Sequence, residues 1–302
     1  MEGFVGNAAA ALSLLLSLLV PSTGHADGSY HDVLNRLNGL LEASPNDDAL
    51  HFQLATAHVD HGDWAACLAE VERVERLAPG KHPTRFLEGR AFCTGGDYQM
   101  ALYALDDVLE AEPNHAPALA ERGKVYLKLR APEKALRDYH AAFKDKTSTQ
   151  RQWYFEAASG FVALGLPETG VDLFEQGLRQ AGADPDFLVQ QLEAAISAQD
   201  YEIALRNADL LKDFWPRPEP WMARRAQILS QAGRANEARA AWTALHDHLM
   251  ALPNLDRGLP LLIPILAEVR QALGLNVPAP VIAPPASDAS ASSSSPNPTD
   301  RS

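Results

Sequence analysis

Hydrophobic residues between positions 96 and 114 recur at the spacing of one face of an α-helix. The apolar positions of this stretch are Tyr98, Ala101, Leu102, Leu105, Val108 and Leu109, with polar residues between them. Gly96 and Asp97 precede the pattern, and Pro113 follows it. The pattern predicts an amphipathic helix that begins after the Gly-Asp pair and ends before the proline.

The same pattern repeats along most of the chain. A small residue stands about five positions after each turn signal, at Cys67, Ala101, Ala135, Gly170, Ala204 and Ala238, with steps of 34, 34, 35, 34 and 34. Four positions later stand Val71, Leu105, Tyr139, Phe174, Ala208 and Trp242, of which only Ala208 is small. A period in this range predicts an array of helical hairpins in which each unit packs on its neighbours.

Each residue type in the repeat has a physical reason. A turn glycine accepts a left-handed backbone, so one helix can end and the next can reverse direction within a few residues. The small residue lets two antiparallel helices approach closely, and the residue four positions later lies on the same helical stripe. Proline cannot continue a helix and therefore closes several units, at Pro45, Pro79, Pro113 and Pro216.

The period and the residue pattern resemble the tetratricopeptide repeat (TPR) family. The residues that carry the resemblance are the small–large–proline set Ala101, Leu105 and Pro113, the pair Ala135 and Tyr139, and the first-helix pairs Gly89 with Phe92 and Gly123 with Tyr126. The resemblance implies an all-α, right-handed solenoid of six helix-turn-helix units. These units span residues 48–81, 82–115, 116–150, 151–184, 185–218 and 219–252.

Two departures from the family pattern are informative. The first helices of units five and six lack the usual Gly/Ala–aromatic pair and carry Leu192 with Ala195, then Ala226 with Leu229. The third unit has no closing proline, and its extra residue falls within residues 146–149. This longer connection predicts a hinge between units three and four.

The segments on either side of the array are expected to cap it. Terminal units need such caps because each repeat otherwise exposes one apolar face. Residues 27–47 predict an N-terminal capping helix with Val33, Leu34, Leu37, Leu40 and Leu41 on its apolar face. Residues 253–275 predict a C-terminal capping helix with Pro264 in its first turn. Residues 276–302, rich in Pro, Ala and Ser, are expected to be disordered.

Residues 1–26 have the features of an export signal. An apolar block from Ala8 to Val20 is broken by Pro21, and small residues at Gly24 and Ala26 suit a signal peptidase. The block is shorter than the roughly 20 apolar residues of a membrane span. The segment before it holds Glu2 and neither Lys nor Arg, which is unusual for such a signal. We expect a periplasmic or secreted bacterial protein, with inner-membrane anchoring by an uncleaved segment as the alternative.

Charge and motifs narrow the function further. The chain of 302 residues has 46% hydrophobic residues, 39 acidic and 26 basic residues, and a net charge of −13, without a Lys/Arg-rich run. Nucleic acid is therefore not an expected partner. The sequence contains no phosphate-binding glycine loop, zinc-protease motif or nucleophile elbow. We expect a non-enzymatic scaffold or adaptor without a cofactor, which binds a protein or peptide and contacts a membrane only if the N-terminal segment is retained.

Histidines and cysteines offer an alternative function. His51, His58 and His61 stand close together in the first unit, so the alternative is a periplasmic metal-binding or redox-linked protein that uses these histidines or the two cysteines, Cys67 and Cys93. The favoured interpretation is structural. The resemblance implies that His51 and His58 take the family's inward-facing positions on the first helix, where imidazoles pack and form hydrogen bonds. Two cysteines alone are ordinary small buried residues.

The resemblance also implies a binding surface. In TPR-like proteins the first helix of each unit lines a concave groove. The matching positions here give a partner-binding groove of Phe52, Phe86, Arg90, Lys124, Lys128 and Phe155. Aromatic anchors beside a local basic patch predict that the ligand is a short acidic segment or the C-terminus of a partner protein. The alternative is that these are ordinary solvated charges and partly buried rings. The clamp by which some relatives hold a C-terminal carboxylate is not reproduced.

Overall fold

The computed structural model describes residues 26–145 and 150–275, and every regular element in these ranges is an α-helix. The first helix of the described part is α2 (Ala26–Ala43). The first helices of the repeats are α3 (Asp48–Asp60), α5 (Thr84–Gly95), α7 (Ala116–Lys128), α9 (Arg151–Ala163), α11 (Pro185–Ser197) and α13 (Glu219–Gln231). The second helices are α4 (Trp64–Leu77), α6 (Tyr98–Ala111), α8 (Pro132–Ala142), α10 (Pro167–Ala181), α12 (Tyr201–Leu211) and α14 (Ala235–Ala251). The short α15 (Asn254–Arg257) and α16 (Leu262–Leu273) follow.

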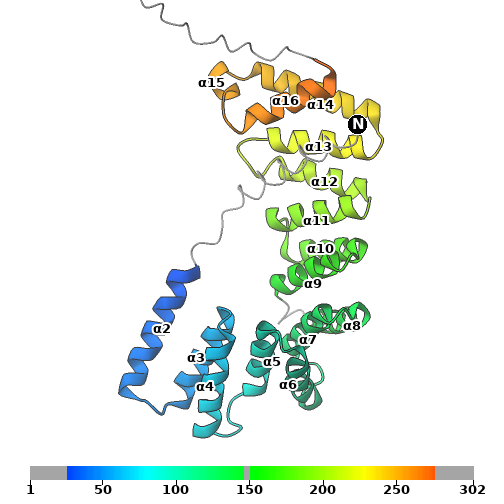
Figure 1. Cartoon of the computed structure of the whole chain (residues 1–302). Helices are drawn as coiled ribbons and strands as arrows, with labels where there is room; N and C mark the ends of the chain where they lie inside the picture. The colour runs from blue at the N-terminus through cyan, green and yellow to red at the C-terminus, as the bar shows by residue number, and fades with distance from the viewer. Residues whose placement is uncertain (1–25, 146–149, 276–302) are drawn as a thin grey trace, which may run out of the picture.

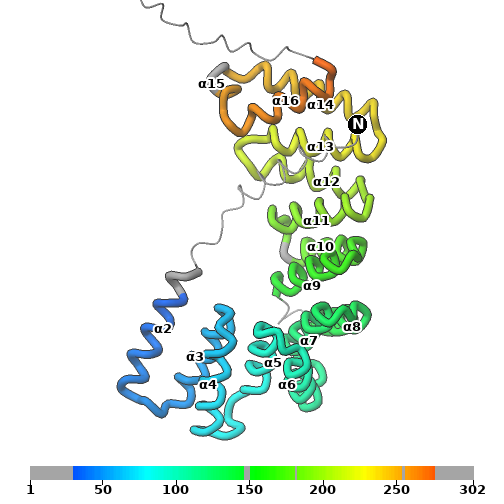
Figure 2. The backbone as a smooth tube through the Cα atoms, in the orientation of Figure 1, coloured from blue at the N-terminus to red at the C-terminus, as the bar shows by residue number. Residues whose placement is uncertain are grey.

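The helices stack in sequence order into one elongated array (Figures 1 and 2). From α2 to α14 each helix packs on its neighbours in sequence, and the first helices α3, α5, α7, α9 and α11 also touch one another in turn. One helix pair lies within each of the six ranges that the repeat pattern gives. The fold is an all-α solenoid of TPR-type helix pairs with capping helices, as the sequence predicts.

The repeating small residue is the close-contact point of each pair. Cys67, Ala101, Ala135 and Ala204 are 0% exposed, Ala238 is 5% exposed, and Gly170 is buried. A Cβ atom added to Gly170 would lie 2.4 Å from the Cγ2 atom of Val162 and 3.0 Å from the Ala158 carbonyl oxygen. The residues four positions later are buried as well: Val71, Leu105, Tyr139, Phe174, Ala208 and Trp242. The periodic pattern therefore marks the helix–helix seams of the solenoid.

A left-handed residue reverses the backbone inside every repeat. Glycine takes this place at Gly62, Gly96, Gly165 and Gly233, whereas Arg130 (φ 55°) and Gln199 (φ 59°) take it in the third and fifth repeats. In five repeats the next helix then starts on an aspartate N-cap, at Asp63, Asp97 and Asp200, or on a first-turn proline, at Pro132 and Pro167, whereas α14 follows Arg234 and has neither. Both devices suit a helix N-terminus because the aspartate satisfies a free N–H group and the proline lacks one.

The junction between the third and fourth repeats differs from the others. Helices α8 and α9 touch each other much less than the corresponding pairs elsewhere in the array. The core nevertheless continues across it, because the rings of Phe143 and Tyr154 stack with centroids 3.9 Å apart. The predicted hinge residues 146–149 lie outside the described residues, so the hinge stays a prediction.

Polar contacts also join the repeats. At the start of the array, Asp48 accepts a hydrogen bond from His82 at 2.5 Å and pairs with Lys81 at 2.7 Å. Hydrogen bonds from Lys81 and then His82 lower the pKa of Asp48 from 3.8 to about 2. These contacts fix the connection between the first two repeats.

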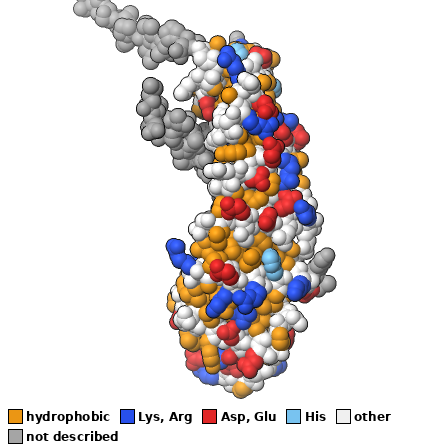
Figure 3. Space-filling model, turned by 90° about the vertical axis from the view of Figure 1, so that its right-hand side faces the viewer, with side chains coloured by type: hydrophobic (Ala, Val, Ile, Leu, Met, Phe, Trp, Pro, Cys, Tyr) orange, Lys and Arg blue, Asp and Glu red, His pale blue; other side chains and the backbone are white. Residues whose placement is uncertain are grey.

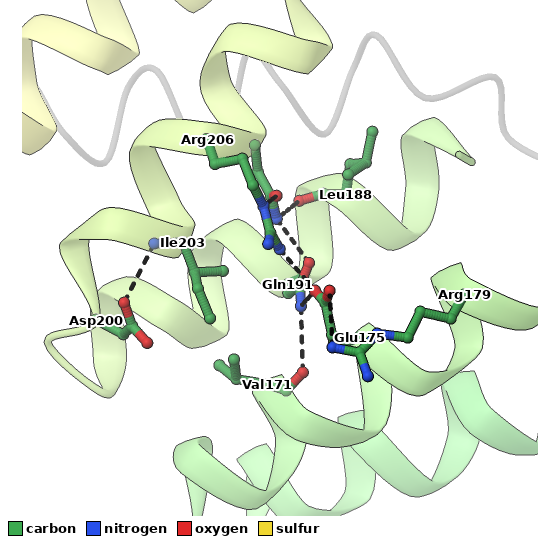
Figure 4. Close-up of polar contacts among 9 residues, drawn as sticks. Val171, Glu175, Arg179, Leu188, Gln191, Asp200, Ile203 and Arg206 are labelled. Carbon is green, nitrogen blue, oxygen red and sulfur yellow. Dashed lines mark hydrogen bonds and ion pairs between the residues drawn. The ribbon is translucent and has the colours of Figure 1, made fainter. Parts of the chain in front are cut away.

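A buried network lies between α10, α11 and α12 (Figure 4). The Gln191 amide donates to the Val171 carbonyl oxygen at 3.2 Å and to a Glu175 carboxylate oxygen at 3.0 Å. The Asn207 amide donates to the Gln191 side-chain oxygen at 2.9 Å, and Arg206 donates to Glu175 at 2.6 Å. Gln191 and Asn207 are both 0% exposed. Because buried amides need partners, this network fixes the relative positions of the fourth and fifth repeats.

Capping helices flank the array. On α2, Leu37 is buried, whereas Leu40 is 49% exposed, so only part of the predicted apolar face is covered. On α16, Leu262, Ile265 and Val269 are buried against α13 and α14, and Pro264 stands in the first turn as predicted. The export signal, apart from Ala26, and the tail from residue 276 lie outside the described residues. Within the described part of the chain, no helix is both long and apolar enough to span a membrane.

Candidate functional site

The six predicted groove residues occupy four successive first helices, but the structure does not bring them into one site. Phe52 on α3 stacks on His82 with ring centroids 4.8 Å apart. Phe155 on α9 packs against the buried rings of Phe174 and Phe187 at 5.8 and 5.3 Å, so it belongs to the core between repeats. Phe86 and Arg90 on α5 lie together, and Lys124 and Lys128 follow on α7.

Arg90 is held by carboxylates from the repeats on either side. Its Nη2 atom donates to Asp60 on α3 at 2.8 Å, and its Nε atom lies 3.8 Å from Glu121 on α7. The guanidinium carbon stands 5.9 Å from the centre of the Phe86 ring, which is cation–π distance. The side chain is 23% exposed. Arg90 is therefore already paired.

Lys124 is also surrounded by acids. Its Nζ atom lies 3.6 Å from Glu121 and 3.9 Å from Glu156. Burial lowers the pKa of Lys124, but the charges of Glu121 and Glu156 outweigh this effect, and the pKa is raised. Lys128, one turn further along α7, is exposed, and no ion pair joins it to another described residue.

A cavity of about 360 Å³ opens among these residues. It is lined by Asp60, Phe86, Arg90, Pro117, Glu121, Gln150, Gln152, Trp153 and Glu156. The lining comes from α3, α5, α7 and α9 together with Gln150 just before α9, so four consecutive repeats build it. Its volume is at the lower end of the range for ligand pockets. Of the predicted site residues, only Phe86 and Arg90 line it.

The charge that the sequence predicts for this groove therefore includes only the cations and leaves out the neighbouring carboxylates. The sequence predicts a local basic patch, whereas Arg90 and Lys124 share their surroundings with Asp60, Glu121 and Glu156. In the view of Figure 3, acidic and basic side chains are likewise interspersed along the solenoid. An acidic ligand stays a prediction, but this arrangement does not favour it, because the two cations already have anionic partners.

The histidines of the first repeat have structural partners. His51 is 2% exposed, and its ring nitrogens lie 2.6 Å from a Glu70 carboxylate oxygen and 3.0 Å from the Pro45 carbonyl oxygen. His58 forms a hydrogen bond with the Tyr30 hydroxyl at 2.9 Å, and the Tyr30 ring stacks on His61 at 3.7 Å. No group of three or more His, Cys, Asp or Glu side chains suited to a metal gathers in the described part of the chain. Nothing in the structure supports the metal alternative.

Cys67 and Cys93 are separate buried thiols. They are 0% and 6% exposed and form no disulfide with each other. Burial raises the pKa of Cys67 to about 12 and that of Cys93 to about 11. Both therefore stay protonated at neutral pH, which makes them poor nucleophiles and supports the interpretation as small core residues.

Comparison with known proteins agrees with the fold. No family model and no curated protein matches the sequence. The C-terminal part of a TPR repeat-containing protein from Cytophaga hutchinsonii is similar, with 12% identity, a TM-score of 0.53, and coverage of 80% of this chain and 98% of the other. Pseudomonas aeruginosa PilF has 14% identity, a TM-score of 0.49, and coverage of 73% and 97%. A thermophilic TPR protein of Thermus thermophilus has 20% identity, a TM-score of 0.48, and coverage of 63% and 98%. The likeness to the Cytophaga hutchinsonii protein, at 12% identity, shows the TPR fold and nothing about the ligand.

Proposed function

We propose that this protein is a non-enzymatic scaffold or adaptor of the cell envelope that docks a segment of a partner protein in the groove of its first helices. The observation that carries the proposal is the cavity built by α3, α5, α7 and α9. A site shared by four repeats exists only in the assembled solenoid. Such a site suits an extended partner segment, because it presents side chains at regular intervals along the groove.

The chemistry of the cavity supports binding rather than turnover. Its polar side chains are carboxylates, amides and one guanidinium, and the carboxylates stand next to cations. The cavity offers donors, acceptors and two aromatic faces, which are the elements of recognition.

The envelope location rests on the sequence of residues 1–26. An apolar block followed by small residues at Gly24 and Ala26 supports export, with an uncleaved anchor as the alternative. N-terminal sequencing of the protein purified from its host, together with cell fractionation, tests this part. A mature protein that begins near Asp27 in the periplasmic fraction is expected, and full-length protein in the cytosol would contradict it.

Groove docking is tested by changing the charges of the groove. The triple variant Arg90→Glu, Lys124→Glu and Lys128→Glu should change the capture of partners cross-linked in envelope extracts of the host. A matched control replaces Arg73, Arg137 and Arg239, which are exposed on the second helices α4, α8 and α14, by glutamate. If both variants capture the same partners as the native protein and in the same amounts, the groove is not the docking site.

A further inference from the structure

The cavity between α3 and α9 has more acidic than basic groups. Asp60, Glu121 and Glu156 line it, against Arg90 alone. Counting Lys124, which touches Glu121 and Glu156 from outside the lining, leaves three carboxylates and two cations. A cavity with this balance attracts a positive group and repels a negative one.

Glu121 accepts no hydrogen bond from another side chain of the described residues. Its side chain is only 17% exposed, and it lies between the Arg90 Nε atom at 3.8 Å and the Lys124 Nζ atom at 3.6 Å. Both distances are too long for a hydrogen bond. No other residue that the structure describes donates to this carboxylate. Because Glu121 lines the open cavity and its oxygens are not fully buried, water can donate to them in the free protein, and a donor on a bound ligand would take the place of that water.

Two further polar groups near Glu121 are under-satisfied. Glu156 accepts one hydrogen bond, from Gln152 at 3.2 Å, and otherwise has only Lys124 at 3.9 Å. The Tyr139 hydroxyl is buried without a hydrogen-bond partner in the described structure, and the side chain is 1% exposed. Its ring lies against Gly123, next to Lys124 on α7, and besides burial the charges of Glu156 and Glu121 raise its pKa. Glu121 and Glu156 therefore leave acceptor capacity open on one side of the cavity, whereas the buried Tyr139 hydroxyl lies behind α7 and does not line it.

The walls of the cavity favour a flat cation. Phe86, Pro117 and Trp153 provide apolar surfaces beside the carboxylates. The resident Arg90 shows how such a group sits here, with its guanidinium on Asp60 and near the Phe86 ring. A guanidinium has five donors in a plane, pairs with carboxylates in two-point fashion and stacks on aromatic rings, whereas an ammonium is a compact, strongly hydrated charge.

We infer that the cavity binds an arginine side chain of the partner segment, with Glu121 and Glu156 as acceptors and Trp153 as a stacking surface. The inference rests on the proposed function and names the chemistry of its ligand. An arginine ligand differs from the acidic segment that the sequence predicts. A carboxylate ligand would be repelled by the three carboxylates, and the two cations, Arg90 and Lys124, already have anionic partners.

The first experiment leaves the protein unchanged. A phage-displayed library of random short peptides is panned against the full-length protein, and the affinity of an enriched peptide is measured by calorimetry. Arginine at one fixed position is expected. Replacing that arginine by citrulline, which keeps the shape and removes the charge, should weaken binding by at least about tenfold, or about 1.4 kcal/mol. Enrichment of acidic or uncharged peptides, or equal affinity for citrulline or lysine at that position, would overturn the inference.

The second experiment changes the cavity. Glu121→Gln with Glu156→Gln should weaken the arginine peptide by at least about tenfold. The control Glu110→Gln with Glu168→Gln removes the same charge from exposed positions on α6 and α10, outside the cavity, and should leave the affinity unchanged. Arg90→Gln removes a competing cation and should strengthen binding.

The outcomes separate the two proposals. The affinity of a peptide could change in the groove triple variant but stay the same in the variant Glu121→Gln with Glu156→Gln. This result would contradict the arginine site and leave the scaffold function supported. Failure of every peptide to enrich, together with unchanged partner capture by the groove triple variant, contradicts both. Loss of affinity in the glutamate pair counts as support only if its circular dichroism spectrum and melting temperature match those of the control.

Discussion

Replacing Asn207 by alanine tests how strongly the buried amide network holds the fourth and fifth repeats together. The Asn207 Nδ2 group donates to the Gln191 Oε1 atom at 2.9 Å and to the Leu188 carbonyl oxygen at 3.3 Å, and the side chain is 0% exposed. Alanine removes both donations. The Gln191 side-chain oxygen then stays buried without a partner among the described residues.

The expected cost follows from these contacts. A buried acceptor left without a donor costs about 1–3 kcal/mol, and the small cavity left by the amide adds to this. We expect the free energy of unfolding to fall by roughly 2–4 kcal/mol. For a protein of about this size, 1 kcal/mol corresponds to about 2–4 °C in melting temperature. The variant should therefore melt roughly 4–16 °C lower, on the same conversion.

Urea titration of the full-length protein measures this loss, and native-state hydrogen exchange locates it. Because repeats are stabilised mainly by their neighbours, amides of α11 and α12 should lose protection more than those of α5 and α6. Asn236→Ala, at an exposed position of α14, is the matched control and should stay within about 0.5 kcal/mol of the native protein. A similarly small effect of Asn207→Ala would refute the reasoning.

Three other consequences can be measured separately. Gln199→Gly removes a side chain from a left-handed backbone position, which stabilises the folded protein by about 1–2 kcal/mol. The added freedom of the unfolded backbone costs about 0.5–1 kcal/mol. Urea titration should therefore show a stability gain of roughly 0.5–1 kcal/mol, and a loss would contradict this prediction. The lowered pKa of Asp48 contributes stability above pH 3.8 that is lost as the pH falls toward about 2. Asp48→Asn should therefore be less stable at neutral pH and should lose less stability on acidification, as followed by thermal melting. Cys67 and Cys93 should react with a thiol reagent at pH 8 only as fast as the protein opens, and rapid labelling of the native protein would contradict their burial.

The fold was predictable because the same residue types recur at the same spacing in successive repeats. Six small residues at nearly constant spacing mark the seams, and an occasional poor match, such as Ala208, does not change the register. The turns were less transparent at Arg130 and Gln199, since the left-handed position usually calls for glycine. The left-handed conformation at these two positions can be predicted from their alignment with the glycines of the other turns, and not from the residue types themselves. Helix α15 was not predicted, because four residues are too few to show a helical period.

The charge of the groove was not predictable from single rows of residues, because its ion pairs cross between repeats. Arg90 pairs with Glu121, 31 positions later, and Glu193 pairs with Arg224 at the same separation. Lys124 pairs with Glu156 at 32 positions, since the third unit is one residue longer. A groove position in one first helix thus faces a position nearly one turn earlier in the next first helix. A set of matching positions, with one residue from each first helix, contains only one member of each ion pair. The charge of that residue is then taken to be unpaired. Reading both positions together would have placed Glu121 and Glu156 beside the predicted cations, and the groove would have been interpreted as a charge-paired surface with unfilled acceptors.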